Sequence, residues 1–394
     1  MVQKLNLYSK KRLFFHTNES LLVNDRVFTG NQIDDFAIAG LQCPNQILLL
    51  GVGYGGAIKG IIASNPDAHV TAVDINAVSL QTCENLYAEF FPELLSQISF
   101  IHDDASHFIQ NIEKNSFDAI CIDLYHPNGY AEVILEEVFW ENMNSSLSMD
   151  GIILANSWGL PSQLDPLTYS TAQTKMLKLM SRFFPNIKAL PSRRNITFLA
   201  SKADLRIKYP ELSGDLKSLD QIGLKLLFFK AYISKNIDVS QIIDIEDNIL
   251  YTIEDLDNLM YQEWGKLLNE INHIRIKAHL NPLSQVNDLL DYPDEAQRFT
   301  EAALMHRPII ATTIPTLAGG MAFVGNKKLD WYIKWLVEEK SRLMMIDLEW
   351  FVNIACWQAY QIATNPYAGY EHWVPHLEKL LFTIQSHVLA TNNI

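Results

Sequence analysis

The chain has 394 residues, of which 48% are hydrophobic, and its mean hydropathy is close to zero. This length exceeds one ordinary domain and predicts two domains with apolar cores of their own. The formal charge of −14 argues against a nucleic acid or an anionic membrane as partner, whereas a small cationic substrate would be attracted.

The cysteines and the N-terminus bear on the cellular compartment. The cysteines form no Cys-x-x-Cys pair and have no histidine at zinc spacing; they are Cys43, Cys83, Cys121 and Cys356. Cys121 lies in an apolar run, which predicts a buried, reduced thiol in a reducing compartment. Residues 1–15 lack the apolar stretch of a signal peptide, so we expect a cytoplasmic protein. From the spacing of the cysteines and histidines we also expect no metal site.

Residues 4–29 alternate polar and apolar side chains around Asn24-Asp25, and this pattern predicts a β-hairpin. After residue 33 the pattern changes to short apolar runs separated by helical stretches. The apolar runs predict buried strands at 46–52, 69–75, 99–104, 117–125 and 150–158.

Helical stretches lie between these strands, beginning at residue 56, passing through Leu80 and Leu86, and centred near residues 109, 137 and 177. Two last runs, 186–192 and 195–201, are joined only by Arg193-Arg194 and predict an antiparallel hairpin. The alternation predicts an α/β fold with a doubly wound, mostly parallel, Rossmann-like sheet. In such a sheet the ligand lies at the carboxyl ends of the strands.

The second half of the chain has a different pattern. From about Lys208 onward the apolar residues recur at helical spacing, which predicts helices throughout. The uncharged stretch 308–325 is interrupted by Pro315 and Gly319-Gly320, and this favours a buried loop and helix over a membrane span. We therefore predict a hairpin region in 1–33, a nucleotide-binding domain in 34–205 and an all-helical domain in 206–394.

A glycine-rich turn follows the first predicted strand of the sheet, in the sequence Gly51-Val52-Gly53-Tyr54-Gly55-Gly56. Glycines allow a strand to turn tightly into a helix and allow the backbone to approach a ligand. Asp74 ends the second strand, where a carboxylate can accept both hydroxyls of a ribose. This order of elements predicts a nucleotide site, and either NAD or an adenosyl donor would supply the ribose.

Two further acids separate these two ligands. Asp104 follows the third strand and could accept the amino group of adenine; Asp123 follows the fourth strand, beside the reacting atoms. An adenosyl-sulfonium site uses acids at both positions, whereas an NAD site has no general need of them. The hairpin after the fifth strand also favours the adenosyl donor. Each acid has a simpler alternative as the N-cap of the following helix.

These residues resemble one family. The segments ILLLGVGYGG, VDIN, HDDASHF, FDAICIDLYHP and TFLASK have the order and spacing of spermidine synthases, the polyamine aminopropyltransferases, within the class I methyltransferase type of fold. The resemblance covers about residues 5–203, and the first hairpin resembles the family's N-terminal β-domain. It implies that Asp74 holds the ribose, Asp104 the adenine and Asp123 the incoming amine. The donor-binding residues would be Gly51, Gly53, Tyr54, Gly55, Asp74, Asp104, Ala105 and Asp123.

The chain also departs from the family. Tyr54 replaces an acid that holds the amine of decarboxylated S-adenosylmethionine, and His126 replaces a second acid after the fourth strand. A histidine at position 126 could act as a base or donor, or have only a structural role. The family's motif after the first hairpin is absent from 32–36, and its loop before the last strand is replaced by 191–194.

We therefore predict a transferase with Asp123 and His126 as catalytic residues. It would move an alkyl group of the aminopropyl type from S-adenosylmethionine or its decarboxylated form to a small-molecule amine, with ordinary putrescine activity in doubt. The alternatives are an S-adenosylmethionine-dependent methyltransferase and an inactive adenosyl-binding module whose helical domain binds a partner. Neither nucleic acid nor membrane is expected as partner, and a homodimer is possible.

Overall fold

The computed structural model gives the positions of most residues of the first half and fewer of the second. It describes residues 27–28, 32–42, 44–126, 129–158, 172–191, 195–210, 218–234, 236–238, 240, 253–298, 335, 338–346, 375, 378–379 and 381–386. The hairpin predicted for residues 4–29 and the uncharged stretch 308–325 lie outside these residues, except for Val27 and Phe28.

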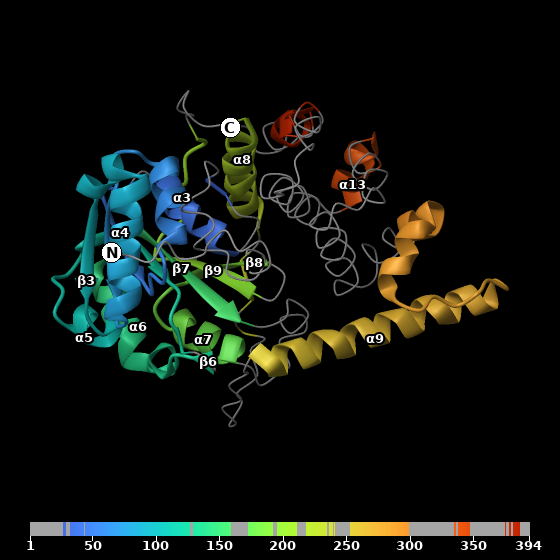
Figure 1. Ribbon diagram of the computed structural model, residues 1–394, viewed down its shortest axis with the longest axis horizontal. Helices are drawn as coiled ribbons and strands as arrows, with labels where there is room; N and C mark the ends of the chain where they lie inside the picture. The colour runs from blue at the N-terminus through green and yellow to red at the C-terminus, as the bar shows by residue number, and fades with distance from the viewer. Residues whose placement is uncertain are drawn as a thin grey trace.

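A seven-stranded sheet forms the centre of the first half, in the order β3-β2-β1-β4-β7-β9-β8 (Figure 1). The first five of these strands run parallel to one another, and β9 runs antiparallel to both of its neighbours, β7 and β8. The strands are β1 (Gln46–Leu50), β2 (His69–Asp74), β3 (Ile98–His102), β4 (Phe117–Ile122), β7 (Leu147–Trp158), β8 (Asn186–Pro191) and β9 (Asn195–Ser201). The predicted α/β fold with a mostly parallel sheet and a closing hairpin is confirmed.

Helices cover both faces of this sheet (Figure 1). One face packs against α2 (Ala37–Leu41), α3 (Gly56–Ser64), α4 (Ala77–Phe90) and α8 (Ser218–Ile233). The other face packs against α5 (Ala105–Gln110), α6 (Glu137–Ser146) and α7 (Ala172–Ser181). Because both faces are buried, the central strands are continuous apolar runs, as in Ile47–Leu50.

The predicted strands 46–52, 69–75, 99–104 and 117–125 extend too far at their carboxyl ends. The observed strands stop at Leu50, Asp74, His102 and Ile122. Beyond these residues the backbone turns toward the next helix or, after β4, forms a short hairpin of β5 (Tyr125–His126) and β6 (Gly129–Tyr130). Gly51, Asp104 and Asp123 therefore lie beyond the ends of their strands, whereas Asp74 is the last residue of β2.

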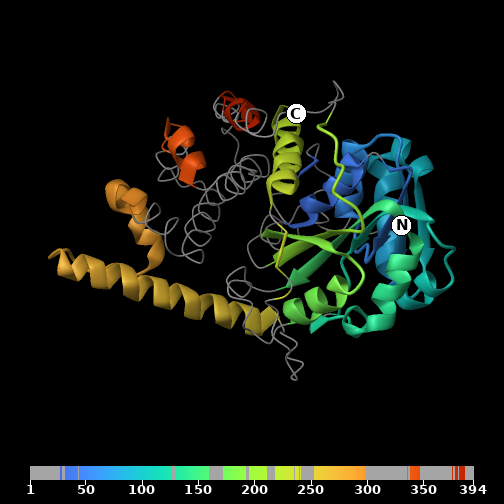
Figure 2. The same cartoon turned by 180° about the vertical axis from the view of Figure 1, so that it is seen from behind.

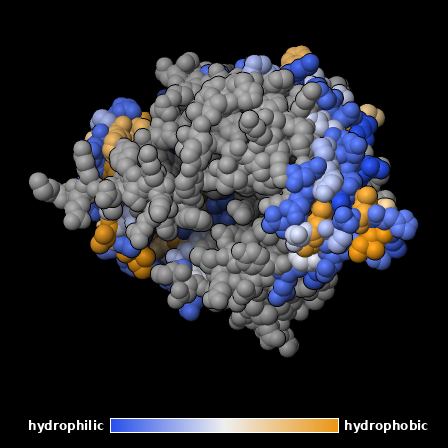
Figure 3. Space-filling model, turned by 45° about the vertical axis from the view of Figure 1, so that its right-hand side comes forward, coloured by the Kyte–Doolittle hydropathy of each residue, from blue (hydrophilic) through white to orange (hydrophobic). Residues whose placement is uncertain are grey.

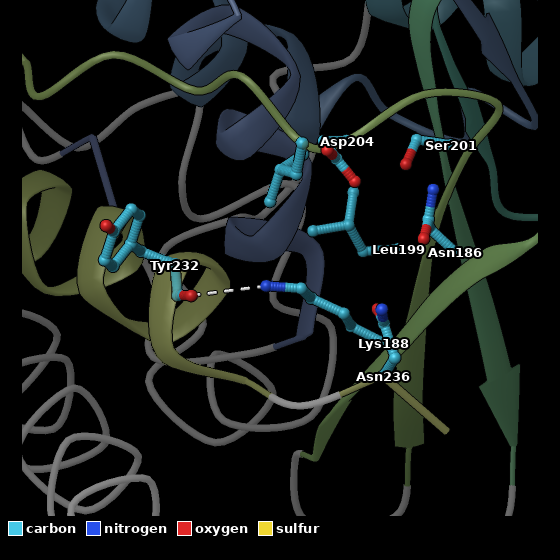
Figure 4. Close-up of a pocket in the computed structure, with 8 residues that line it drawn as sticks. Asn186, Lys188, Leu199, Ser201, Asp204, Tyr232 and Asn236 are labelled. Atoms are coloured by element: carbon cyan, nitrogen blue, oxygen red, sulfur yellow. Dashed lines mark hydrogen bonds between the residues drawn. The ribbon is translucent and has the colours of Figure 1, made fainter. Parts of the chain in front are cut away.

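Helix α8 belongs to the same core as the sheet, although it lies beyond residue 205. Near its start the Asp220 carboxylate accepts the backbone N–H of Val27 at 3.2 Å. At its end, Lys188 of β8 donates to the carbonyl oxygens of Ala231 and Tyr232 at 2.9 and 3.2 Å (Figure 4). A lysine beside the last carbonyls also stabilises the helix dipole. We propose that the unit that folds with the sheet extends to about residue 238.

Most described residues of the rest of the second half are helical. They include α9 (Ile253–Lys277), the 3₁₀ helix η6 (Val286–Asp291) and α13 (Lys340–Ile346), and α9 runs away from the sheet (Figures 1 and 2). Within the part of the chain that the structure describes, no helix has the length and apolar composition needed to cross a bilayer. Figure 3 shows small apolar patches among hydrophilic surface. In and just after α9 the exposed apolar residues include Ile274, Ile276 and Leu280.

A cavity of about 200 Å³ lies between β8, β9 and the end of α8 (Figure 4). Asn186 and Ser201, which line it, pair with each other beside Ile152. Since Ile152 pairs with Ala119, near the beginning of the parallel part of the sheet, this cavity lies at the end of the sheet opposite the glycine turn. It is therefore separate from the predicted nucleotide site.

Candidate active site at the carboxyl ends of the strands

The glycine turn connects β1 to α3 and requires its glycines. Gly51, Gly53 and Gly55 have φ angles of 82°, 52° and 78°, in the left-handed region that other residues rarely adopt. A Cβ atom on Gly51 would overlap the carbonyl oxygen of Asp123. The buried Tyr87 hydroxyl also stabilises the turn, because it donates to the Gly55 carbonyl oxygen at 2.8 Å. The backbone of this turn is therefore fixed before any ligand binds.

Asp74 lies beside the glycine turn, as predicted for the ribose acid. Its Oδ2 atom accepts the backbone N–H groups of Val52 and Gly53 at 2.8 and 2.9 Å. Its Oδ1 atom accepts that of Asn76 at 2.8 Å. A carboxylate has about four acceptor positions, so one remains for a ribose hydroxyl. Asp74 thus supports the turn in addition to its predicted contact with the ligand.

Replacing Asp74 by asparagine should weaken donor binding by roughly 1.5–3 kcal/mol, or about ten- to a hundredfold, because hydrogen bonds to a charged group are lost. Calorimetric titration with S-adenosylmethionine measures this change. Asp67→Asn is the matched control, since Asp67 is an exposed acid on the turn before β2. Equal affinities for the wild-type protein and a folded Asp74→Asn variant would show that the nucleotide site lies elsewhere.

Asp104 is the N-cap of α5, which was the simpler alternative for this residue. Its Oδ1 atom accepts the backbone N–H groups of Ser106 and His107 at 2.9 and 3.1 Å and the Ser106 hydroxyl at 2.6 Å. The Ser106 hydroxyl is the main reason that the pKa of Asp104 lies below its usual value. Because all three bonds use Oδ1, Oδ2 is the oxygen that faces a ligand in our proposal. Ala105 follows as the first residue of α5.

Asp123 follows β4 directly beside the glycine turn. Its backbone N–H donates to the Leu50 carbonyl oxygen at 2.8 Å, and its side chain remains partly accessible. The Nδ2 atom of Asn156 donates to its Oδ1 atom at 2.8 Å. Burial and, to a smaller extent, the Asp74 carboxylate raise the pKa of Asp123 to about 6, against the lowering effect of Asn156. A carboxylate with this pKa is a suitable general base near neutral pH.

The strand register explains why these side chains meet. Leu50 pairs with Ile122, and Ile122 pairs with Ala155. Asp123 and Asn156 are the next residues of their strands, so they lie side by side and project to the face covered by α3 and α8. On that face Asn156 is also paired with Thr197 of β9. Asn156 was not predicted from the sequence, because it belongs to a strand and its neighbours are distant in the chain.

Tyr54 and His126 lie farther from this pair. The Tyr54 side chain is partly buried against the apolar core on the α3 side of the sheet. His126 is exposed in the β5–β6 hairpin, and within the described residues its side chain makes no hydrogen bond to Asp123. A catalytic role of His126 therefore remains a prediction. The loop 191–194 lies outside the described residues except for Pro191.

Two apolar residues next to Asp74 were also not predicted from the sequence as site residues. Ile75 and Val78 are 62% and 76% exposed. Apolar side chains at this position can pack against the face of a purine ring, although single exposed apolar residues are also common on protein surfaces. The sequence signal was present as an isoleucine directly after the predicted ribose acid.

Among the described residues no group of three His, Cys, Asp or Glu side chains is placed to hold a metal.

Residues 30–200 match the family model of the spermine/spermidine synthase domain. The chain is 25% identical over 197 residues to a polyamine aminopropyltransferase of Neisseria meningitidis, an alignment that covers 48% of this chain and 72% of that protein. It is 24% identical over 201 residues to that of Clostridium perfringens, covering 48% of this chain and 66% of that protein. Residues 30–200 are thus similar to spermidine synthases, and we call this segment the spermidine synthase-like domain.

A solved structure of a probable spermidine synthase from Corynebacterium glutamicum is similar to the chain with a TM-score of 0.37 and 19% identity. That similarity covers 44% of this chain and 64% of the solved one, slightly less than two thirds of its length. The family match supports assignment of the spermidine synthase-like domain as a transferase. The family match ends at residue 200, so α8 and its Lys230 lie outside the matched residues.

Proposed function

We propose that this protein transfers an alkyl group of the aminopropyl type from an adenosyl-sulfonium donor to an amine. The observation that carries the proposal is Asp123, a partly accessible carboxylate beside the glycine turn that is held by Asn156 and has a pKa of about 6. The spermidine synthase-like domain in which it lies agrees with this reaction. The amine substrate and the cytoplasm as compartment are part of the proposal.

In the proposed reaction a neutral amine attacks the carbon next to the sulfonium sulfur. A C–N bond forms, the C–S bond breaks, and the sulfur keeps the electron pair and becomes a neutral thioether. The positive charge passes to the nitrogen, and the Asp123 carboxylate accepts a proton from the resulting ammonium. Because the leaving group is already good, the protein mainly aligns the two reactants.

The donor would lie across the ends of β1, β2 and β3. In this arrangement the remaining acceptor position of Asp74 takes one ribose hydroxyl, and Oδ2 of Asp104 accepts the amino group of adenine. The exposed side chains of Ile75 and Val78 would pack against the purine ring. The fixed backbone of the glycine turn would approach the sulfonium side of the donor.

A methyltransferase is the second candidate, and Tyr54 favours it. Decarboxylated S-adenosylmethionine carries a free ammonium, which a carboxylate at position 54 would neutralise, whereas a phenol cannot. Intact S-adenosylmethionine has its own carboxylate beside its amine and needs no acid from the protein. Incubation of the protein with each donor and a panel of amines, followed by mass spectrometry, distinguishes aminopropyl from methyl transfer. Lack of any product with either donor would overturn both proposals.

Replacing Tyr54 by aspartate should shift donor preference toward decarboxylated S-adenosylmethionine by about ten- to a hundredfold, which corresponds to roughly 1.5–3 kcal/mol for a charge-assisted hydrogen bond. Calorimetric titration of both donors into both proteins gives the ratio of affinities. Tyr54→Phe is the control that keeps the ring without adding an acid. If the wild-type protein already prefers the decarboxylated donor by more than about tenfold, Tyr54 does not set the donor preference.

A further inference from the structure

The cavity between β8, β9 and the end of α8 is lined by charges of both signs and by apolar side chains (Figure 4). Lys188 reaches it from β8, and Asp204 reaches it from the segment that follows β9. Leu199, Leu205 and Tyr232 also line it, and they belong to or pack against the apolar core on the α8 side of the sheet. The cavity therefore offers a cation, an anion and an apolar wall to one small molecule.

Hydrogen bonds hold the walls of this cavity together. The Ala203 carbonyl oxygen accepts the side-chain amide of Asn186 at 3.1 Å, and this bond ties the residue before Asp204 to β8. On the other side Lys188 donates to the last carbonyl oxygens of α8. The backbone N–H of Ile237, beyond α8, donates to a carbonyl oxygen of β8 at 2.7 Å. The backbone around both charged side chains is therefore fixed.

Within the described part of the chain, the Asp204 carboxylate accepts no hydrogen bond and forms no ion pair. The Lys188 ammonium is directed to the end of α8, and Arg206, two residues beyond Asp204, lies beside Asp150 at 4.0 Å. Charges in a partly enclosed cavity are screened less than charges on an open surface. A ligand that carries an ammonium group would supply the partner that Asp204 lacks.

The volume of the cavity limits its ligand to a small molecule. A water molecule takes about 30 Å³ of the liquid, so a cavity of about 200 Å³ holds on the order of seven to ten non-hydrogen atoms. An adenosyl donor is too large for this space. Most of the lining residues lie beyond residue 200, where the family match ends. The cavity is therefore a feature of this chain that its similarity to spermidine synthases does not explain.

We propose that this cavity binds a free α-amino acid with an apolar side chain, at a site separate from that of the transfer reaction. The ammonium of the amino acid lies beside the Asp204 carboxylate, and its carboxylate lies beside the Lys188 ammonium. Its side chain packs against Leu199, Leu205 and Tyr232. The two charges of the ligand match the two charges of the lining, whereas a simple amine or a simple carboxylic acid leaves one of them unmatched. L-leucine has a size within the range that the volume allows.

Ligand-detected NMR with L-leucine as the probe tests this site. We expect L-leucine to bind with a Kd on the order of 1 mM or below. Isopentylamine lacks the carboxylate of leucine, and 4-methylpentanoate lacks its ammonium. Each should bind at least about tenfold more weakly, because each loses one charge-assisted contact. Binding of either derivative as tightly as L-leucine would overturn the proposal, and this comparison needs no variant.

Substitutions test whether the amino acid lies in the cavity. Asp204→Asn changes an exposed side chain, so the variant should fold, and it should bind L-leucine about tenfold more weakly or worse. Asp67→Asn is the matched control, an exposed acid elsewhere on the sheet domain, and should bind as the wild-type protein does. Lys188→Met should also weaken binding, and the ligand series in the wild-type protein covers the case that this variant does not fold.

Asp123→Asn separates the cavity from the active site. L-leucine should bind equally to this variant and to the wild-type protein. Binding that is lost in Asp123→Asn and kept in Asp204→Asn would place the amino acid in the active site and overturn the proposal. Since none of these measurements requires turnover, absence of L-leucine binding would overturn the cavity as a site and leave the proposed transfer reaction untouched.

Discussion

Replacing Asp123 by asparagine should lower the rate of transfer by a factor on the order of 10²–10⁴, the usual contribution of a positioned general base. Asparagine has nearly the same shape and can still accept the hydrogen bond from Asn156, so the variant should fold. In the wild-type protein kcat/KM should fall as the pH drops below about 6, because the protonated Asp123 cannot accept a proton. Steady-state kinetics between pH 5 and 8 measure both effects.

His126→Gln is the control for this profile, because His126 is the other residue for which the sequence predicts a catalytic role. If Asp123 is the base, His126→Gln keeps the acid limb and Asp123→Asn removes it. The reverse outcome would transfer the role of base to His126. Full activity of Asp123→Asn would show that the protein only aligns the reactants.

Replacing Asp123 by asparagine should also make the protein more stable. The pKa of Asp123 rises from 3.8 to about 6 on folding, so the folded state binds the proton more tightly than the unfolded chain. Stability therefore falls as the pH rises from about 4 to 6, and the penalty is complete above pH 6. Removing the charge should add about 1–3 kcal/mol to the free energy of unfolding at pH 8, with the lower part of this range favoured by the partial exposure of the carboxyl. No gain is expected near pH 4. Denaturant titrations at the two pH values test this.

Replacing Lys230 by methionine should destabilise the protein by about 3–5 kcal/mol, because the substitution leaves the Asp35 carboxylate buried without its cation. The two side chains are 7% and 2% exposed and form a bond of 2.7 Å. Burial raises the pKa of Asp35, and Lys230 and the Thr197 hydroxyl offset part of this effect. The loss is measured as the change in the denaturant midpoint.

The double variant Asp35→Asn/Lys230→Met should recover most of the lost stability, since it removes both charges. Lys225→Met, on the same helix, is the control for the change in side chain and should have a small effect. A small effect of Lys230→Met as well would mean that α8 does not depend on this ion pair. The predicted loss would instead show that a helix beyond residue 205 is part of the folding unit of the sheet.

The sequence by itself determined the order of strands and helices in the first half. Strands such as Ile47–Leu50 are buried on both faces and therefore leave an uninterrupted apolar run in the sequence. Parallel strands place their carboxyl ends at one edge, so the glycines and acids after each strand, such as Gly51, Asp74 and Asp123, could be grouped into a site without coordinates. The strand boundaries were less accurate, because the polar residues that end a strand are also compatible with extended backbone.

Only the tertiary structure decided which residues from distant strands meet. Asn156 contacts Asp123 because β7 lies next to β4, and a strand pairing of residues 33 positions apart leaves no local pattern in the sequence. The pair of Asp35 and Lys230 joins residues 195 positions apart, and it places α8 in the core of the sheet despite the change of pattern near residue 208. Local periodicity reports which face of an element is buried, whereas burial against a particular partner depends on the packing of the whole chain.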